Sequence, residues 1–182
     1  MAFNYKSSVN GAQRNLELVL IYNSITVAVG DVVEVYTNGS ATNGAAATPL
    51  FGVVHAIVDA STNPIVHGTA VAGTAIGSST NSVTTAADNT TTGAYYALVD
   101  TSNNSKYSAE VSGTLGTTVS STLRGCRVDV DSANTDYGRL LESTATRTIG
   151  TPANFYSWGV DPDDSTRLIV SLAMTELDSV AE

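Results

Sequence analysis

The chain has 182 residues, of which 42% are hydrophobic and only 14% are charged. This length is enough for one large domain or two small ones with a buried core. The 17 acidic and 8 basic residues give a formal net charge of -9, and no segment concentrates Lys or Arg. Because binding to phosphate backbones needs a basic surface that releases counterions, the composition argues against nucleic acid, and equally against an anionic membrane, as a direct partner.

Small uncharged side chains take the place that Lys and Glu usually have on a protein surface. The sequence contains 25 Thr, 20 Ser and 13 Asn. Thr and Val are stiff at Cβ and fit a pleated strand better than a helical turn, so the composition favours an all-β protein. The purely apolar runs, such as residues 18–22 and 94–99, are far below the roughly 20 residues that span a bilayer. The N-terminus lacks the apolar stretch of a secretory signal, and the lone Cys126, expected to be buried, fits folding in the cytosol.

Alternating apolar and polar residues predict strands in the first half of the chain. Gly30-Asp31 separates two of them as a turn, and Gly52 within another indicates a bulge or a close backbone approach. Residues 38–49 have no large apolar side chain and are expected to form a surface loop. The expected strands are residues 16–22, 25–29, 31–37, 50–58 and 65–71, the first three as closely spaced antiparallel neighbours, with a turn at 59–64.

The second half continues the pattern. Residues 68–92 predict a glycine-softened strand that runs into a long exposed loop, and residues 112–122 are a loop or a domain boundary. The expected strands are residues 93–99 and 105–111, paired as a hairpin, then 126–130, 137–142, 155–160 and 167–172, the last two joined by an Asp- and Pro-containing turn at 161–166. Residues 172–180 have the one pattern that suits a short helix.

About ten short strands with regular turn signals predict an antiparallel β-barrel or sandwich. We divide the chain into an N-terminal arm (residues 1–15), a β-barrel (16–111) and C-terminal strands (112–182) that belong to the same domain or to a second small lobe. The arm has two interpretations. Phe3, Tyr5 and Arg14 are anchor-type residues that would order on a partner, or the segment is a frayed end or an edge strand.

Few titratable side chains are placed to converge on an active site. His55 and His67 lie in strand-like runs and are read as structural, with a two-histidine metal site as the alternative. The segment from Asp129 through Asp131 to Asp136 has alternating oxygen ligands. It fails as a helix-loop-helix calcium loop, because its sixth position is not Gly and its twelfth is Leu140, so a solvated turn is favoured over an ion site.

The neighbouring Asp163 and Asp164 would be a general acid and base in an enzyme, but beside a proline they are typical of a turn. We therefore expect no enzyme, no cofactor and no bound metal. The competing enzyme hypothesis is a hydrolase that uses Asp129 and Asp163 as its two carboxylates.

Phe155, Tyr156 and Trp158 form the densest aromatic cluster. Alternation places Tyr156, Trp158 and Val160 on one face of the strand and Phe155 on the other. Either the Tyr156 face enters the core, or it is an exposed platform for sugar rings or a hot spot in a protein interface.

Two segments carry a resemblance to a known family. Residues 25–35 (ITVAVGDVVEV) and residues 50–65 (LFGVVHAIVDASTNPI) resemble the small β-barrels of head decoration (cement) proteins of tailed bacteriophages. There, too, a strand, a Gly-Asp turn, a second strand and a Gly-Val-Val strand recur among loops rich in Ala, Thr and Gly. The resemblance covers roughly residues 16–66, and residues 112–182 match no motif of the family.

The resemblance implies a structural virion protein that binds the outer surface of the mature head. Its partner would be the major capsid protein, and it would act as a homo-oligomer, with a trimer favoured. It would be made in the host cytoplasm, and its contact residues would include Phe3, Tyr5, Arg14, Tyr156 and Trp158. The alternatives are a carbohydrate- or receptor-binding module of a phage fibre or tail, and a subunit of a bacterial surface fibre.

Overall fold

The structure is a computed structural model that describes residues 3–46, 48–64, 82–87, 89, 94–112, 123–131, 136–146 and 153–173. In this part of the chain the protein is all-β, with one turn of 3-10 helix at Val9–Gly11. The strands are β1 (Asn4–Ser8), β2 (Leu16–Leu20), β3 (Thr26–Ala28), β4 (Val32–Val35), β5 (Ala41–Asn43), β6 (Gly52–Asp59), β7 (Ser82–Thr84), β8 (Tyr95–Asp100), β9 (Ser105–Ser112), β10 (Arg127–Asp131), β11 (Asp136–Thr146), β12 (Phe155–Asp161) and β13 (Asp164–Leu172). The predicted fold class is confirmed.

Five strands close into a barrel in the order β9-β11-β10-β12-β13, with β13 pairing back onto β9. All of these pairs are antiparallel except the parallel pair β9–β11. Strand β1 adds to the same sheet by pairing with the first half of β9. Because every barrel strand has two neighbours, closure leaves few unpaired backbone groups.

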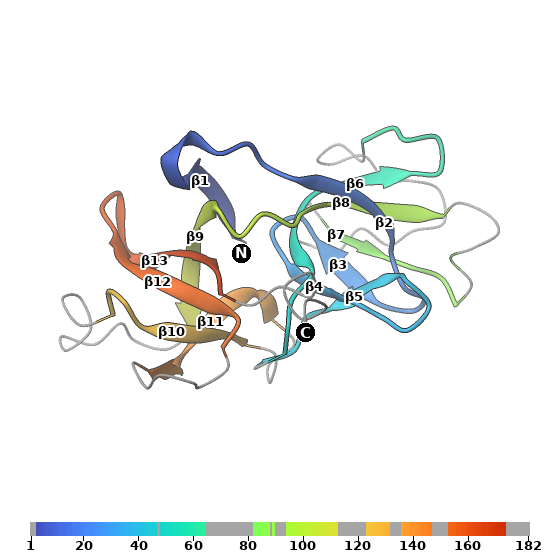
Figure 1. The fold of residues 1–182 in the computed structure, drawn as a ribbon. Helices are drawn as coiled ribbons and strands as arrows, with labels where there is room; N and C mark the ends of the chain where they lie inside the picture. Colours follow the sequence, from blue (N-terminus) through green and yellow to red (C-terminus); the bar gives the residue numbers. More distant parts are fainter. Residues whose placement is uncertain are drawn as a thin grey trace, which may run out of the picture.

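The other strands lie beside this barrel (Figure 1). A second sheet has the order β2-β8-β6-β4-β5, and a parallel bridge between Ile21 and Ala41 links its two outer strands at one point. Strands β3 and β7 form a separate two-stranded ribbon. The chain crosses between the two groups twice, after β1 and again between β8 and β9.

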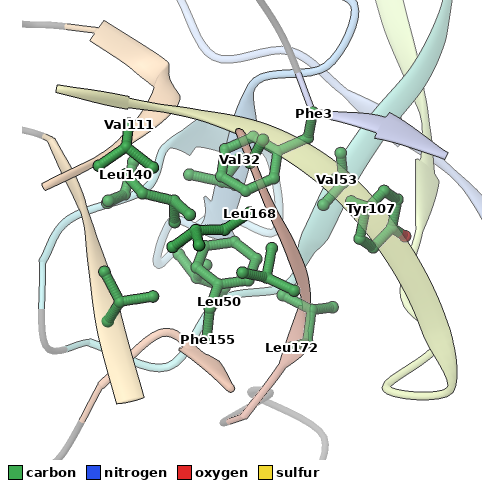
Figure 2. Packing of buried hydrophobic residues seen from close by; sticks show 14 of the residues in the cluster. Phe3, Val32, Leu50, Val53, Tyr107, Val111, Leu140, Phe155, Leu168 and Leu172 are labelled. Atoms are coloured by element: carbon green, nitrogen blue, oxygen red, sulfur yellow. The ribbon is translucent and has the colours of Figure 1, made fainter. Parts of the chain in front are cut away.

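Strands β4 and β6 separate two hydrophobic cores. Val32 and Val53 pack in the barrel core with Leu168 and Phe155, as Figure 2 shows. Their neighbours Val33 and Val54 pack in the second core. Since successive strand residues point to opposite faces, a Val-Val pair supplies one side chain to each core. The two groups of strands therefore share a buried wall.

Strand β9 shows why the barrel forms from these residues. Tyr107, Ala109 and Val111 are buried in the barrel core, while Lys106 and Glu110 on the other face are only partly buried and Ser108 on that face is the small polar exception. This is the two-residue period that a strand with one buried face requires. Burying each large apolar side chain contributes roughly 1.5–3 kcal/mol relative to leaving it exposed.

Several turn predictions are confirmed. Gly30 has a φ of 88°, which glycine adopts without strain. At Gly52 a Cβ atom would lie 2.3 Å from the backbone oxygen of Asp100, so the backbones approach as closely as expected. The turn between β12 and β13 is held by the Asp161 carboxylate, which accepts a hydrogen bond from the Asp163 amide at 3.0 Å.

Strand pairing differs from the prediction in two places. Strands β8 and β9 are not a hairpin, because β8 pairs with β2 and β6 whereas β9 pairs with β1, β11 and β13. The change of sheet therefore falls at residues 101–104, ahead of the boundary expected at residue 112. Strands β2, β3 and β4 also do not pair with one another, because β2 pairs with β8, β3 with β7, and β4 with β5 and β6. In each case the partner is chosen by the face that must be buried, which sequence proximity does not reveal.

Smaller corrections concern single segments. The expected loop at residues 38–49 contains β5, which pairs with β4. Leu172, where a short helix was expected to begin, ends β13. Residues 174–180 of that segment, the strand expected at 65–71 and most of residues 68–92 lie outside the described residues. In the described part of the chain, no helix has the length and apolar character needed to cross a membrane.

Candidate partner-binding surface

The aromatic cluster of β12 is divided between the core and the surface. Phe155 is fully buried, whereas Tyr156 is 38% exposed and Trp158 is half-buried. The interpretation in which the Tyr156 face enters the core is therefore wrong. The buried face of β12 is the Phe155 face, because the Phe3 ring from the N-terminal segment stacks on Phe155 with 4.7 Å between the ring centroids.

A β-bulge sets the position of Trp158. Ser157 pairs with Val170 and Gly159 with Ile169, so Trp158 is an extra residue in the ladder between β12 and β13. Gly159 has a φ of 119°, a conformation that side chains other than glycine rarely adopt. Bulges of this kind bend a strand and re-aim a side chain. The local sequence Trp-Gly thus turns the indole outward.

Three contacts hold the indole in place. Its Nε1–H donates to the Ser171 hydroxyl at 3.0 Å. The Lys106 ammonium lies 4.0 Å from the ring centroid, and the Tyr156 ring meets the indole edge-on with 5.3 Å between centroids. Cation–π and edge-to-face contacts each stabilise by about 0.5–1.5 kcal/mol. We call the surface formed by Lys106, Tyr156, Trp158 and Ser171 the aromatic surface.

Phe3 does not belong to any exposed surface. It is 4% exposed and packs in the barrel core, so it is withdrawn from the expected contact residues. The N-terminal segment is an edge strand, since β1 pairs with β9. The Lys6 ammonium also lies 3.2 Å from the Asp161 carboxylate and 3.0 Å from that of Asp163. The structure thus supports the edge-strand interpretation over a free arm.

Asp161 shows how firmly β1 is fixed to the turn between β12 and β13. Burial alone would raise the pKa of its carboxyl group, which is 2% exposed. Hydrogen bonds from Ser108, the Asp163 amide and Lys6 outweigh burial and hold the pKa of Asp161 below its usual value. The same contacts raise the pKa of Lys6, with Asp163 as the larger cause and Asp161 as the second.

Tyr5 and Arg14 contact each other and form a second pair, separate from the aromatic surface. Tyr5 is 39% exposed, and the Arg14 guanidinium carbon lies 4.1 Å from its ring centroid. The Arg14 Nε donates to the Asp100 carboxylate at 2.7 Å. Of the five residues predicted to contact a partner, the structure therefore joins Tyr5 with Arg14 and Tyr156 with Trp158, and buries Phe3.

The residues considered for catalysis or metal binding have structural surroundings. Asp129 lies in β10, is 8% exposed and accepts the Asn154 amide at 3.0 Å, so the expected solvated turn is wrong at this residue. Asp131 is also a buried β10 residue, and Leu140 lies in the barrel core. Asp163, by contrast, has a side chain that is 78% exposed at a turn. The two carboxylates of the hydrolase hypothesis thus differ sharply in environment.

The remaining candidates lie in turns and strands, apart from the aromatic surface. Asp164 accepts hydrogen bonds from the Thr166 hydroxyl and amide, which lower the pKa of its carboxyl group. His55 is exposed on β6, and His67 lies outside the described residues. Among the described residues, no group of three or more potential ligands is placed to hold a metal ion. Cys126 is buried, as predicted.

Sequence reasoning missed two members of the aromatic surface. Lys106 and Ser171 are distant from Trp158 along the chain, and reach it only because β9, β13 and β12 are adjacent in the barrel. A polar residue in a strand carries no signal of such a neighbour. Comparison of the chain with protein-family models, with curated proteins and with solved structures finds no match.

Proposed function

We propose that this chain is a structural virion protein that decorates the outer surface of a mature phage head. The observation that supports it best is the aromatic surface, where Tyr156 and Trp158 project from the barrel in a fixed arrangement. Trp and Tyr are the residue types that most often dominate the binding energy of protein interfaces. Because the indole is already held by Ser171 and Lys106, little side-chain entropy is lost when a partner binds.

The proposed mechanism is physical and involves no reaction. A protein that binds the assembled shell, and not its dissociated subunits, stabilises the shell by RT ln(1 + [L]/Kd) at each site. Each site occupied at about 100 times Kd would then add roughly 2.7 kcal/mol. The net charge of -9 would also keep decorated particles dispersed through mutual repulsion.

Self-association is part of the proposal, with a trimer favoured. Leu16 and Leu18 are 40% and 50% exposed on β2, which pairs with β8 along one edge. Exposed apolar side chains on an outer strand favour contact with another protein surface. A second copy of the chain, or the capsid protein itself, would cover them.

Recognition of a carbohydrate is the competing function of the aromatic surface. A sugar ring stacks on an open aromatic face, and one face of the Trp158 ring is covered by the Lys106 ammonium. We therefore favour a protein partner over a glycan. If the chain is instead a fibre or tail module that binds a receptor, the same variants would lose receptor binding.

The test is co-sedimentation of the purified chain with expanded and with immature heads of the phage that encodes it. Wild type should pellet with expanded heads only. Trp158→Ala should weaken binding by about thirtyfold, as expected for the loss of a hot-spot side chain. Tyr36→Ala, which removes a 46% exposed tyrosine from the other sheet, is the matched control and should change binding less than threefold or so. Equal binding of wild type and Trp158→Ala, or glycan binding that Trp158→Ala abolishes, would contradict the proposal.

A further inference from the structure

A cavity of about 300 Å³ opens where the two groups of strands meet, apart from the aromatic surface. Phe3, Val53 and Tyr107 line its buried end, since each is 4% exposed or less. Asn4, Tyr5 and His55 are its exposed lining residues and mark its mouth. A volume of this size lies at the lower end of the range for small-molecule sites.

Arg14 places a positive charge in the wall of the cavity. Its Nε donates to Asp100 at 2.7 Å, and one Nη lies 3.1 Å from the Nδ1 of His55. A guanidinium has five N–H donors and accepts no hydrogen bond, so some of its N–H groups remain for a ligand after these two contacts. The His55 Nδ1 must then be the acceptor, which puts the ring proton on Nε2.

His55 is a neutral donor in this arrangement. Partial burial is the largest cause that lowers the pKa of its imidazole, and the nearby Arg14 charge is the second. The ring is therefore uncharged at neutral pH, and its Nε2–H adds a donor at the mouth of the cavity.

Tyr107 supplies the observation that points to a ligand. Its side chain is 1% exposed and lines the cavity, yet no partner in the described part of the chain meets its hydroxyl at normal hydrogen-bond distance and angle, although the Asp100 carboxylate and the Ser105 hydroxyl lie near it. Figure 2 shows the ring at the edge of the core beside Val53, with the hydroxyl directed away from the other core residues. Burial raises the pKa of the phenol, and the Asp100 carboxylate nearby raises it further, so the hydroxyl remains protonated and able to donate.

The Asp100 carboxylate lies near this hydroxyl and already accepts hydrogen bonds from three other donors. It accepts from Arg14 at 2.7 Å, from the Ser105 hydroxyl at 2.8 Å and from the Ser102 amide at 3.1 Å. A buried hydroxyl without a partner is costly, and native proteins usually satisfy such a group with protein, water or ligand.

We propose that this cavity binds a small carboxylate with a short apolar or aromatic body. Three polar groups around the cavity, Arg14, His55 and Tyr107, present donors, and the amide of Asn4 can donate or accept, so the best-matched end of the ligand is an acceptor. A carboxylate accepts several hydrogen bonds at once, and pairs best with a charged donor. The apolar body would lie against Phe3 and Val53. This site does not depend on binding to a capsid.

The test uses the full chain with benzoate and acetate as probes and benzyl alcohol as the neutral control. NMR resonances of His55, Tyr5 and Tyr107 should shift with at least one carboxylate, and benzyl alcohol should bind about tenfold more weakly than benzoate. Tyr107→Phe should lower the affinity for the carboxylate by about threefold to tenfold. It should also raise the melting temperature of the protein, because an unpaired buried hydroxyl is removed. Tyr156→Phe is the matched control and should change neither quantity.

Three results would overturn the proposal. One is the absence of shifts with both carboxylates at about ten times a millimolar Kd. Another is equal binding of benzoate and benzyl alcohol. The third is unchanged carboxylate affinity in Tyr107→Phe, even with a raised melting temperature, because the hydroxyl would then be a packing cost and not a ligand donor.

Discussion

Phe3→Ala tests whether the N-terminal segment is part of the fold or a free arm. The Phe3 ring is 4% exposed, stacks on Phe155 at 4.7 Å and meets Tyr107 edge-on at 6.4 Å. Truncating a buried phenylalanine to alanine removes the transfer free energy of the ring and leaves a cavity, together about 3–5 kcal/mol. For a chain of this length, each kcal/mol lowers the melting temperature by about 2–4 °C, so the expected fall is roughly 6–20 °C.

The assay is urea unfolding followed by the fluorescence of Trp158, the one tryptophan of the chain. Tyr5→Ala is the matched control, because Tyr5 lies on the same strand but is 39% exposed, and it should cost less than about 1 kcal/mol. If Phe3→Ala and Tyr5→Ala both change the free energy of unfolding by less than about 1 kcal/mol, β1 is not part of the cooperative fold and the reasoning is refuted.

Three further predictions concern backbone packing and protonation. Gly52→Ala should lower the free energy of unfolding in urea by more than about 3 kcal/mol, because its Cβ would meet the backbone of Asp100 at 2.3 Å. Gly44→Ala is the control and should lower it less, since the closest contact of its Cβ, at 2.6 Å, is the end of a leucine side chain. Equal losses in the two variants would contradict this reasoning. Asp161 has a lowered folded pKa, so its contribution to stability is complete well above the unfolded value of 3.8 and is lost as pH falls through the folded pKa; Asp161→Asn should therefore flatten the loss of stability from about pH 5 to pH 2, and an unchanged profile would count against the contacts described. The imidazole of His55 should have a pKa below 6.5 by NMR in the folded chain, because partial burial and the nearby Arg14 charge both lower it, and a midpoint at or above 6.5 would contradict these surroundings.

Local features of the fold were predictable from the sequence, because they depend on neighbouring residues. The turn at Gly30 follows from the freedom of glycine, and the turn after Asp161 follows from a carboxylate that binds nearby amides. The alternation that defines most strands is likewise a local property. These signals were sufficient for the all-β class.

Pairing between distant strands was not predictable. Residues 93–99 and 105–111 are separated by a short turn-rich segment and resemble a hairpin, but β8 and β9 enter different sheets. The Val32-Val33 and Val53-Val54 pairs show how the two sheets are divided. Each pair places one side chain in each hydrophobic core, so β4 and β6 lie between the two cores. A pattern of period two identifies the faces of a strand and does not say what covers each face.

The candidate site shows the same division between local and distant information. The aromatic cluster itself was evident, but the choice of buried face depended on Phe3, a residue more than a hundred positions away. The partners of Trp158, namely Lys106 and Ser171, come from two other strands. The cavity beneath Arg14 is formed by both groups of strands, so no single segment could indicate it.

The proposed function is tested most directly by the copy number of this chain in purified phage particles. Quantitative mass spectrometry would give that number relative to the major capsid protein. Head decoration predicts a copy number that scales with the number of capsomers in expanded heads. Heads purified before expansion should then carry no bound copies. A few copies per particle would place the chain on a tail, fibre or vertex, and absence from particles that infect normally would contradict the account altogether.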